Sequence, residues 1–180
     1  IRKKLINAEL NFNSMENTFG DQKGQVSFLL NNVFDYEKNG LKRKGFFIDL
    51  ACADGVFLSN THFLEKNLGW NGILFEPNPY FHEKIRASRS SELVTECISS
   101  VVNELVDFRI DNGMFGGQVA DGFDNNAANR AVQLVDAEMI KLRTTTLAAV
   151  LMKNEAPPLI DFMSLDIEGG EWEALKCFPF

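Results

Sequence analysis

The apolar residues along the chain fall into two kinds of segment, which alternate. Short and nearly continuous apolar runs have the length of strands that are covered on both faces of a parallel sheet; they are residues 46–50, 72–76, 93–98 and 159–166. Between them, apolar residues recur at helical spacing in residues 26–34, 56–68 and 147–152, and in a helix that begins at Pro79. Strands that alternate with helices predict the α/β class, with a mainly parallel sheet and flanking helices.

The remaining segments set the domain boundaries. Residues 1–24 are polar and show no clear period, so we expect a polar N-terminal segment and then one domain over residues 25–180. Residues 106–110 alternate as an additional strand does, and residues 140–146 have extended character. Residues 111–130 carry four glycines. This segment is predicted to be either a surface loop or a lid over a substrate.

The predicted elements also place individual side chains. Asn78 is the expected cap of the helix that begins at Pro79, and Arg89 is expected to face solvent from that helix. The cysteines form no C-x-x-C pair, and each lies within or beside an apolar element; they are Cys52, Cys97 and Cys177. This pattern predicts reduced, buried thiols in a cytoplasmic protein.

A turn after the first strand organises the predicted sheet. The strand at residues 46–50 runs into residues 51–55, which are all small except for Asp54. Small side chains at the carboxyl end of a strand allow a ligand to approach the backbone closely, as in a Rossmann-like unit. The dinucleotide pattern G-x-G-x-x-G is absent, because Ala51 and Ala53 stand where glycines would favour it. A nicotinamide-dependent oxidoreductase is therefore the weaker alternative.

Two acidic residues stand at the ends of the first two strands. Asp49 suits a ligand that carries an amine, whereas it would repel a pyrophosphate. Glu76 follows the second strand at about the offset expected of a ribose-binding acid. Its carboxylate can accept hydrogen bonds from two ribose hydroxyls. For either acid alone, a loop cap remains the alternative interpretation.

Further acids lie at the carboxyl end of the strand at residues 159–166. In a doubly wound sheet this strand lies beside the first one, so Asp166 and Glu168 are expected near the turn at residues 51–55. Such acids can take a proton from a hydroxyl, attract a cation or bind a metal. No histidine is placed to support a metal, and none is predicted. Glu171 is equally explained as an acid in the first turn of a helix.

Three blocks of sequence together resemble the signature of FkbM-type methyltransferases: residues 45–55, 70–79 and 160–171. The resemblance covers about residues 25–180, and it implies a Rossmann-like class I methyltransferase fold with S-adenosylmethionine as the cofactor. It also implies methylation of a hydroxyl on a small molecule or a sugar. A non-catalytic binding module of the same fold stays open as an alternative. The family's fold continues past the last helix, so we expect a domain that is incomplete at its C-terminus.

The resemblance also implies roles for single residues. The methionine end of the cofactor would be lined by Asp49, Ala51, Asp54 and Gly55. Glu76 would hold the ribose, and Ser99 would lie near the adenine. Asp166 and Glu168 would face the transferring methyl group as candidate bases. Ala51 departs from the glycine that is often found at its position in the family.

Charge and hydropathy limit the partners. The net charge of −7 does not indicate a basic surface of the kind that binds a nucleic acid, so no nucleic-acid partner is expected. No apolar run approaches the ~18 residues that a membrane span needs, so no membrane partner is expected. The strand at residues 159–166 is followed by no further strand, and its open edge predicts association into a homodimer.

Overall fold

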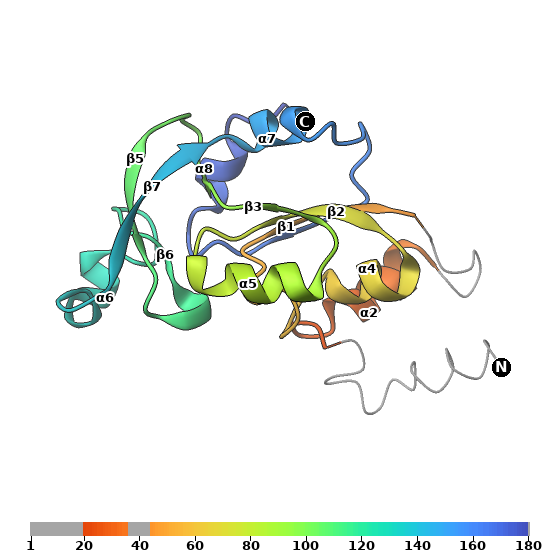
Figure 1. Cartoon of the computed structure of the whole chain (residues 1–180), viewed down its shortest axis with the longest axis horizontal. Coiled ribbons are helices and arrows are strands. Elements are labelled where there is room, and N and C mark those ends of the chain that lie inside the picture. Colours follow the sequence, from red (N-terminus) through yellow and green to blue (C-terminus); the bar gives the residue numbers. More distant parts are fainter. Residues whose placement is uncertain (1–19, 36–43, 180) are drawn as a thin grey trace.

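The structure is a computed structural model that describes residues 20–35 and 44–179. Within these residues a central sheet has the strand order β3-β2-β1-β8, and every neighbouring pair is parallel (Figure 1). Its strands are β1 (Phe46–Leu50), β2 (Asn71–Phe75), β3 (Glu92–Val94) and β8 (Phe162–Leu165). β8 lies beside β1, which confirms the predicted placement of the strand that carries Asp166 at its end.

Helices cover both faces of the central sheet, so its strands are buried on two sides (Figure 1). One face carries α2 (Gln25–Phe28), its π-helical continuation η2 (Leu29–Val33), α4 (His62–Leu68) and α5 (Pro79–Ser88). The other face carries α7 (Leu147–Lys153) and α8 (Glu171–Leu175). Because side chains alternate along a strand, Phe47 packs into the first core, whereas Ile48 and Leu50 pack into the second.

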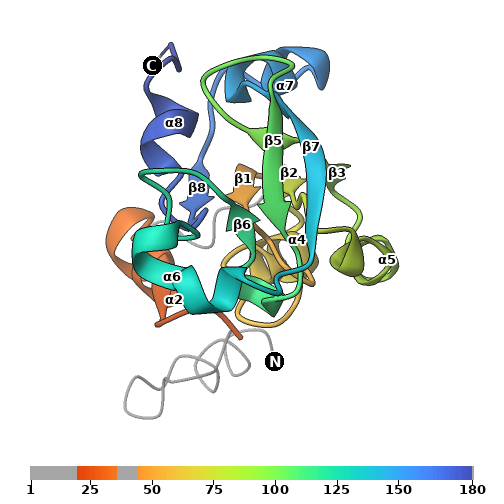
Figure 2. The same cartoon turned by 90° about the vertical axis from the view of Figure 1, so that its left-hand side faces the viewer.

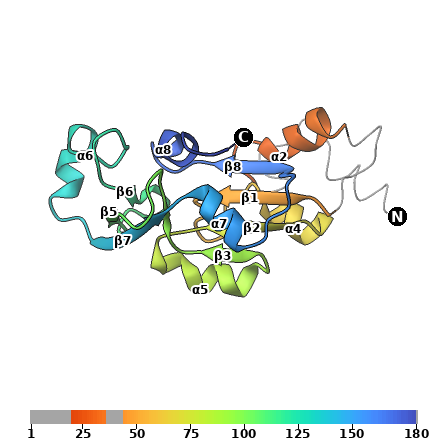
Figure 3. The ribbon, with the colours of Figure 1, turned by 90° about the horizontal axis from the view of Figure 1, so that it is seen from above.

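A second sheet stands beyond the carboxyl ends of the central strands (Figure 3). Its order is β4-β7-β5-β6, with β5 antiparallel to both β7 and β6 (Figure 2). Its strands are β4 (Cys97–Ile98), β5 (Leu105–Arg109), β6 (Gly117–Gln118) and β7 (Met139–Thr145). The segment between β5 and β7 also contains the short helix η3 (Gly113–Phe115) and α6 (Ala127–Leu134). The stretch predicted as a loop or lid is therefore partly regular structure.

Three predicted elements are wrong in their extent, and the strand expected over residues 159–166 is only the four residues of β8. The helix expected over residues 56–68 begins only at His62, because Asp54 Oδ1 accepts hydrogen bonds from Val56 N and Phe57 N and holds a turn there. The single strand expected over residues 93–98 is divided between the two sheets. β3 pairs with β2, whereas β4 pairs with β7. A continuous apolar run does not show that the chain changes partners within it.

Other local predictions are confirmed, with one exception. Asn78 Oδ1 accepts a hydrogen bond from Tyr80 N and caps α5, with Pro79 at the first helical position. Cys52 and Cys97 are buried free thiols, but Cys177 is exposed. α8 ends before Cys177, so the helical period does not carry this residue to the buried face that Ala174 occupies. Among residues 20–35 and 44–179, no helix combines the length and the apolar character that crossing a membrane requires.

Gly72 in β2 provides a test of the packing between the central strands. A Cβ atom at this position would lie 2.4 Å from the Phe47 ring and 2.6 Å from its carbonyl oxygen. We expect Gly72→Ala to lower the free energy of unfolding by about 1–3 kcal/mol in urea titrations, because the neighbouring strand must shift. The exposed neighbour Asn71 supplies the control, since Asn71→Ala should change it by less than about 0.5 kcal/mol. Equal stability of the two variants would contradict this packing.

Candidate active site

The backbone after β1 forms a tight turn with left-handed residues at alternate positions. Ala51, Ala53 and Gly55 have φ angles of 65°, 49° and 78°. The amides of Ala51 and Cys52 both donate to the Phe75 carbonyl oxygen, at N···O distances of 2.9 and 3.1 Å. A left-handed backbone conformation costs a residue with a Cβ about 1–2 kcal/mol of conformational free energy, so other contacts must fix the turn. Alanine is the smallest side chain that bears this penalty, and it keeps the turn accessible.

Glu76 ties the end of β2 to this turn. Its Oε2 accepts a hydrogen bond from Ala53 N and its Oε1 accepts one from Asn78 N, both at 2.8 Å. The side chain is buried, and burial raises the pKa of Glu76 to about 8, against these two backbone hydrogen bonds. The interpretation of Glu76 as a loop cap therefore agrees with these two hydrogen bonds. Each carboxyl oxygen has more than one lone pair, whether the acid is neutral or ionised, so an oxygen that accepts from a backbone amide can still accept from a ligand.

Asp49 lies in β1 beneath the turn. Its Oδ2 accepts a hydrogen bond from Thr61 Oγ1 at 2.5 Å. Burial raises the pKa of Asp49, while the Thr61 hydrogen bond and the positive charge of Arg89 oppose that shift. Arg89 reaches the same hydroxyl, since its Nη2 donates to Thr61 Oγ1 at 2.9 Å. The acid at the strand end is thus held by a hydroxyl that Arg89 orients.

The prediction that Arg89 faces solvent is wrong, because its guanidinium is completely buried below the turn. Nε donates to Glu65 Oε2 at 2.8 Å and Nη1 donates to the Gly55 carbonyl oxygen at 2.8 Å. The guanidinium carbon lies 5.6 Å from the centre of the Phe47 ring. Burial disfavours the Glu65 carboxylate, but hydrogen bonds from two serines and Arg89 outweigh it and lower its pKa to about 2. Helical periodicity missed this residue because Arg89 lies just past the end of α5, in extended backbone.

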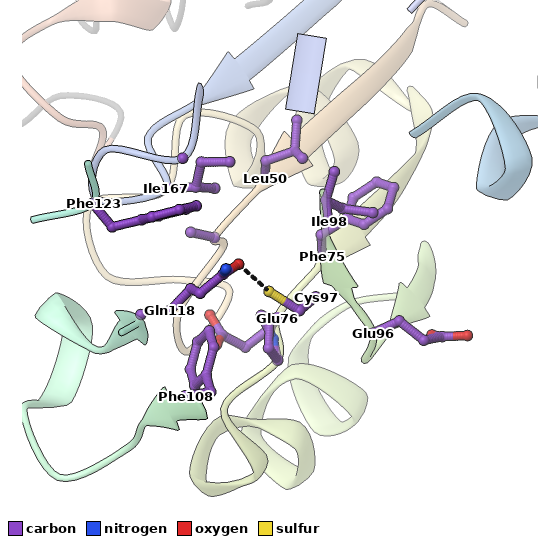
Figure 4. A pocket seen from close by; sticks show the side chains of 14 residues that line it. Leu50, Phe75, Glu76, Glu96, Cys97, Ile98, Phe108, Gln118, Phe123 and Ile167 are labelled. Carbon is purple, nitrogen blue, oxygen red and sulfur yellow. Dashed lines mark hydrogen bonds between the residues drawn. The ribbon is translucent and has the colours of Figure 1, made fainter. Parts of the chain in front are cut away.

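Two hollows open at the carboxyl edge of the central sheet, and Leu50 and Ala51 line both. The first hollow, together with the solvent space at its mouth, has a volume of about 580 Å³ and is of mixed polarity. Its lining includes Gln22, Asp49, Asn60, Phe115, Asp166 and Glu168. The second, measured in the same way, has a volume of about 490 Å³ and is mainly apolar (Figure 4). Its lining includes Phe75, Glu76, Ile98, Phe108, Gln118 and Phe123. We call them the acidic hollow and the apolar hollow.

The acidic hollow brings Asp166 and Glu168 to the turn. Both carboxylates line it together with Asp49 and Ala51. Gln22 Nε2 lies 3.4 Å from Asp166 Oδ2, and Arg130 Nη2 lies 3.2 Å from Glu168 Oε2. Burial raises the pKa of Glu168 and the charge of Arg130 opposes this shift. Neighbouring Asp166 raises the pKa further.

Three of the predicted site residues line neither hollow. The Asp54 carboxylate caps the loop after the turn, and the Gly55 carbonyl accepts from Arg89. Ser99 is buried, and its amide donates to the Thr145 carbonyl oxygen. Its predecessors Cys97 and Ile98 line the apolar hollow instead.

A family model described as the FkbM methyltransferase domain matches residues 49–178. The chain belongs to the FkbM methyltransferase family. This methyltransferase has the Rossmann-like class I fold of that family, with the parallel sheet at its centre. No curated protein and no solved structure gave a match in the corresponding searches.

Several side chains of this methyltransferase's site carry no recognisable signal in the sequence. Arg130 comes from α6, and its ion pair with Glu168 joins residues 38 positions apart. Asn60 donates to Ser164 Oγ from 104 positions away, and so links the loop before α4 to β8. Gln118 sits on a two-residue strand within a glycine-rich segment. Each depends on a pairing between distant segments, for which one sequence holds no local pattern.

Replacing Arg89 tests the buried ion pair below the turn. Arg89→Met keeps most of the side-chain volume but leaves Glu65 buried without its cation, so we expect a loss of about 3–5 kcal/mol in the free energy of unfolding. Arg86, which is exposed in the last turn of α5, is the matched control, and Arg86→Met should change the stability by less than about 0.5 kcal/mol. Denaturant titration of both variants gives the comparison. Similar small losses in the two would show that the pair does not hold the turn.

Glu76 makes stability depend on pH in a defined window. Its pKa rises from the model-peptide value of 4.5 to about 8 on folding, so the unfolded chain ionises first as the pH rises. The contribution of the neutral acid is complete below pH 4.5 and is lost as the pH rises towards 8. Glu76→Gln keeps a neutral group, so the stability of the wild type should fall by a few kcal/mol relative to this variant between about pH 5 and 8. A stability difference that does not change with pH would contradict the raised pKa.

Proposed function

We propose that this methyltransferase uses S-adenosylmethionine to methylate a hydroxyl group on a small molecule or a sugar. The observation that carries the proposal is the pair of adjoining hollows at the carboxyl edge of the central sheet, which share Leu50 and Ala51. S-adenosylmethionine has a cationic amino-acid end and an uncharged base at the other end. The two hollows differ in the same way, because carboxylates line one of them and the other is mainly apolar.

The acidic hollow fits the methionine end of the cofactor. Three carboxylates line it, those of Asp49, Asp166 and Glu168, and among the described residues no lysine or arginine contributes to its lining. A sulfonium and an ammonium group gain from carboxylates at short range, whereas a pyrophosphate would be repelled. The small residues of the turn permit close approach to the backbone. This chemistry favours S-adenosylmethionine over a nicotinamide dinucleotide.

The apolar hollow fits the adenosine end. Glu76 lies at its edge with both carboxyl oxygens already fixed by backbone amides, which holds them ready to accept from ribose hydroxyls. Aromatic and aliphatic side chains form most of the remaining wall, which suits a flat base. Ile98 and Phe108 come from different strands of the second sheet. In this proposal the second sheet supplies part of the wall around the adenosine end, from its place beyond the carboxyl ends of the central strands.

The bound cofactor would supply an electrophilic methyl group, and the protein's part is to orient the acceptor and take its proton. Asp166 and Glu168 are the acids beside the turn that can accept a proton from a hydroxyl. Glu168 is held by Arg130, whereas the nearest described donor to Asp166 is a glutamine amide at 3.4 Å. Asp166 is thus the freer carboxylate, and we assign it as the principal base. The exposed ring of Phe115 offers an apolar face beside these acids for the body of the acceptor.

Calorimetry tests the cofactor directly. S-adenosylhomocysteine, the demethylated product, should bind with a dissociation constant in the micromolar range, and NAD should give no heat of binding at the same concentration. Tight binding of NAD without any response to S-adenosylhomocysteine would overturn the proposal. The protein itself is the same in both titrations, so a difference reports on the ligand alone.

Asp166→Asn tests the proposed base. The substitution keeps the shape and removes the charge, so methyl transfer from labelled S-adenosylmethionine to a panel of sugars and small hydroxyl compounds should fall by about 10²–10⁴-fold. The melting temperature should stay close to that of the wild type. Asp121→Asn, at an exposed position outside both hollows, is the control and should keep full activity. Undiminished transfer by the Asp166 variant would assign the acid a structural role.

A further inference from the structure

Few polar groups reach the interior of the apolar hollow, and their partners differ. Glu76 has a backbone amide on each carboxyl oxygen. Glu96 is at the rim, with 43% of its side chain exposed and Lys153 Nζ at 4.0 Å. Gln118 is left as the uncharged amide among the lining residues. An uncharged amide in an apolar wall is suited to form hydrogen bonds with the polar atoms at the edge of a flat ring.

Gln118 is aimed into the hollow by its strand. In the antiparallel pair of β5 and β6 it stands opposite Phe108, and both residues line the hollow. Figure 4 shows its amide directed across the hollow towards Cys97. Cys97 Sγ donates to Gln118 Oε1 at 3.7 Å. Over the described residues, Gln118 Nε2 makes no hydrogen bond to an acceptor, and it is not one of the buried side-chain atoms left without a partner, so it is open to a ligand.

The contact with Cys97 indicates which terminal atom of the Gln118 amide is the oxygen and which is the nitrogen. Burial raises the pKa of Cys97 to about 12, so the group stays a thiol and acts as a donor. A donor at this place favours the orientation in which Gln118 presents its oxygen towards Cys97 and its NH₂ group to the hollow. The oxygen has a second lone pair, so it can also accept from a ligand. The amide therefore offers one acceptor and one donor side by side in a fixed order.

We propose that Gln118 recognises the 6-amino edge of a purine base bound in the apolar hollow. Its Oε1 accepts from the 6-amino group and its Nε2 donates to ring nitrogen N1, which is the acceptor beside that amino group on the Watson–Crick edge of adenine. A 6-oxo purine reverses both partners, and the Cys97 contact opposes the rotation of the amide that would accommodate it. This inference rests on the proposed function, because adenine enters the hollow as part of S-adenosylmethionine.

The test compares two ligands that differ only at this edge. Isothermal titration of the wild type with S-adenosylhomocysteine and with S-inosylhomocysteine, its 6-oxo counterpart, should show a tenfold to hundredfold preference for the adenine form. Gln118→Met has similar length but no hydrogen-bonding amide, and we expect its preference to fall below about threefold. Gln133→Met, at an exposed position of α6, is the matched control and should keep the full preference.

Each outcome bears on a separate claim. A wild type that binds both ligands equally overturns the role of Gln118 but leaves the cofactor assignment intact. A folded Gln118→Met variant that keeps the preference shows that another group reads the base, and also overturns the inference. A wild type that binds neither ligand rejects the proposed cofactor itself, and the role of Gln118 with it. The wild-type comparison needs no variant, so the inference can fail even if Gln118→Met does not fold.

Discussion

The buried ion pair of Arg89 and Glu65 is the contact on which the arrangement of the site depends. It joins the residue after α5 to the middle of α4, and the same guanidinium holds the Gly55 carbonyl and the Thr61 hydroxyl. Two charges removed from water are tolerated only when nearly all their hydrogen-bonding groups are satisfied. That requirement fixes both helices relative to the turn. Asp49 is held at the end of this chain of contacts through Thr61.

A second polar contact fixes the turn from its other side. Glu76 joins the end of β2 to the amide of Ala53, so the turn is held from below by Arg89 and from the side by Glu76. The two apolar cores lie on either face of the sheet, and both extend to this edge, since Cys52 belongs to the first and Leu50, Phe75 and Ile98 belong to the second. Burial therefore holds the sheet and helices and forms much of the wall of the apolar hollow, whereas directional hydrogen bonds fix the turn.

The central sheet and its acids could be predicted because their signals are local. Strands such as Phe46–Leu50 are buried on both faces and read as continuous apolar runs, and Asn78 with Pro79 marks a helix start in two adjacent residues. The second sheet could not be assembled in this way, since β4 and β7 pair across more than 40 positions of chain. Arg89 was missed for a related reason. Its partners come from the loop and helix at residues 55–65, and an arginine has no apolar period that would show it to be buried.

The shared wall between the hollows has a steric consequence. Ala51 lines both, and its side chain is a single methyl group on a left-handed backbone. An elongated ligand that occupies both hollows would pass along the residues that they share, Leu50 and Ala51. A branched or longer side chain at position 51 would divide the space into two separate compartments. The size of the side chain at position 51 therefore influences whether the edge of the sheet holds one long molecule or two short ones.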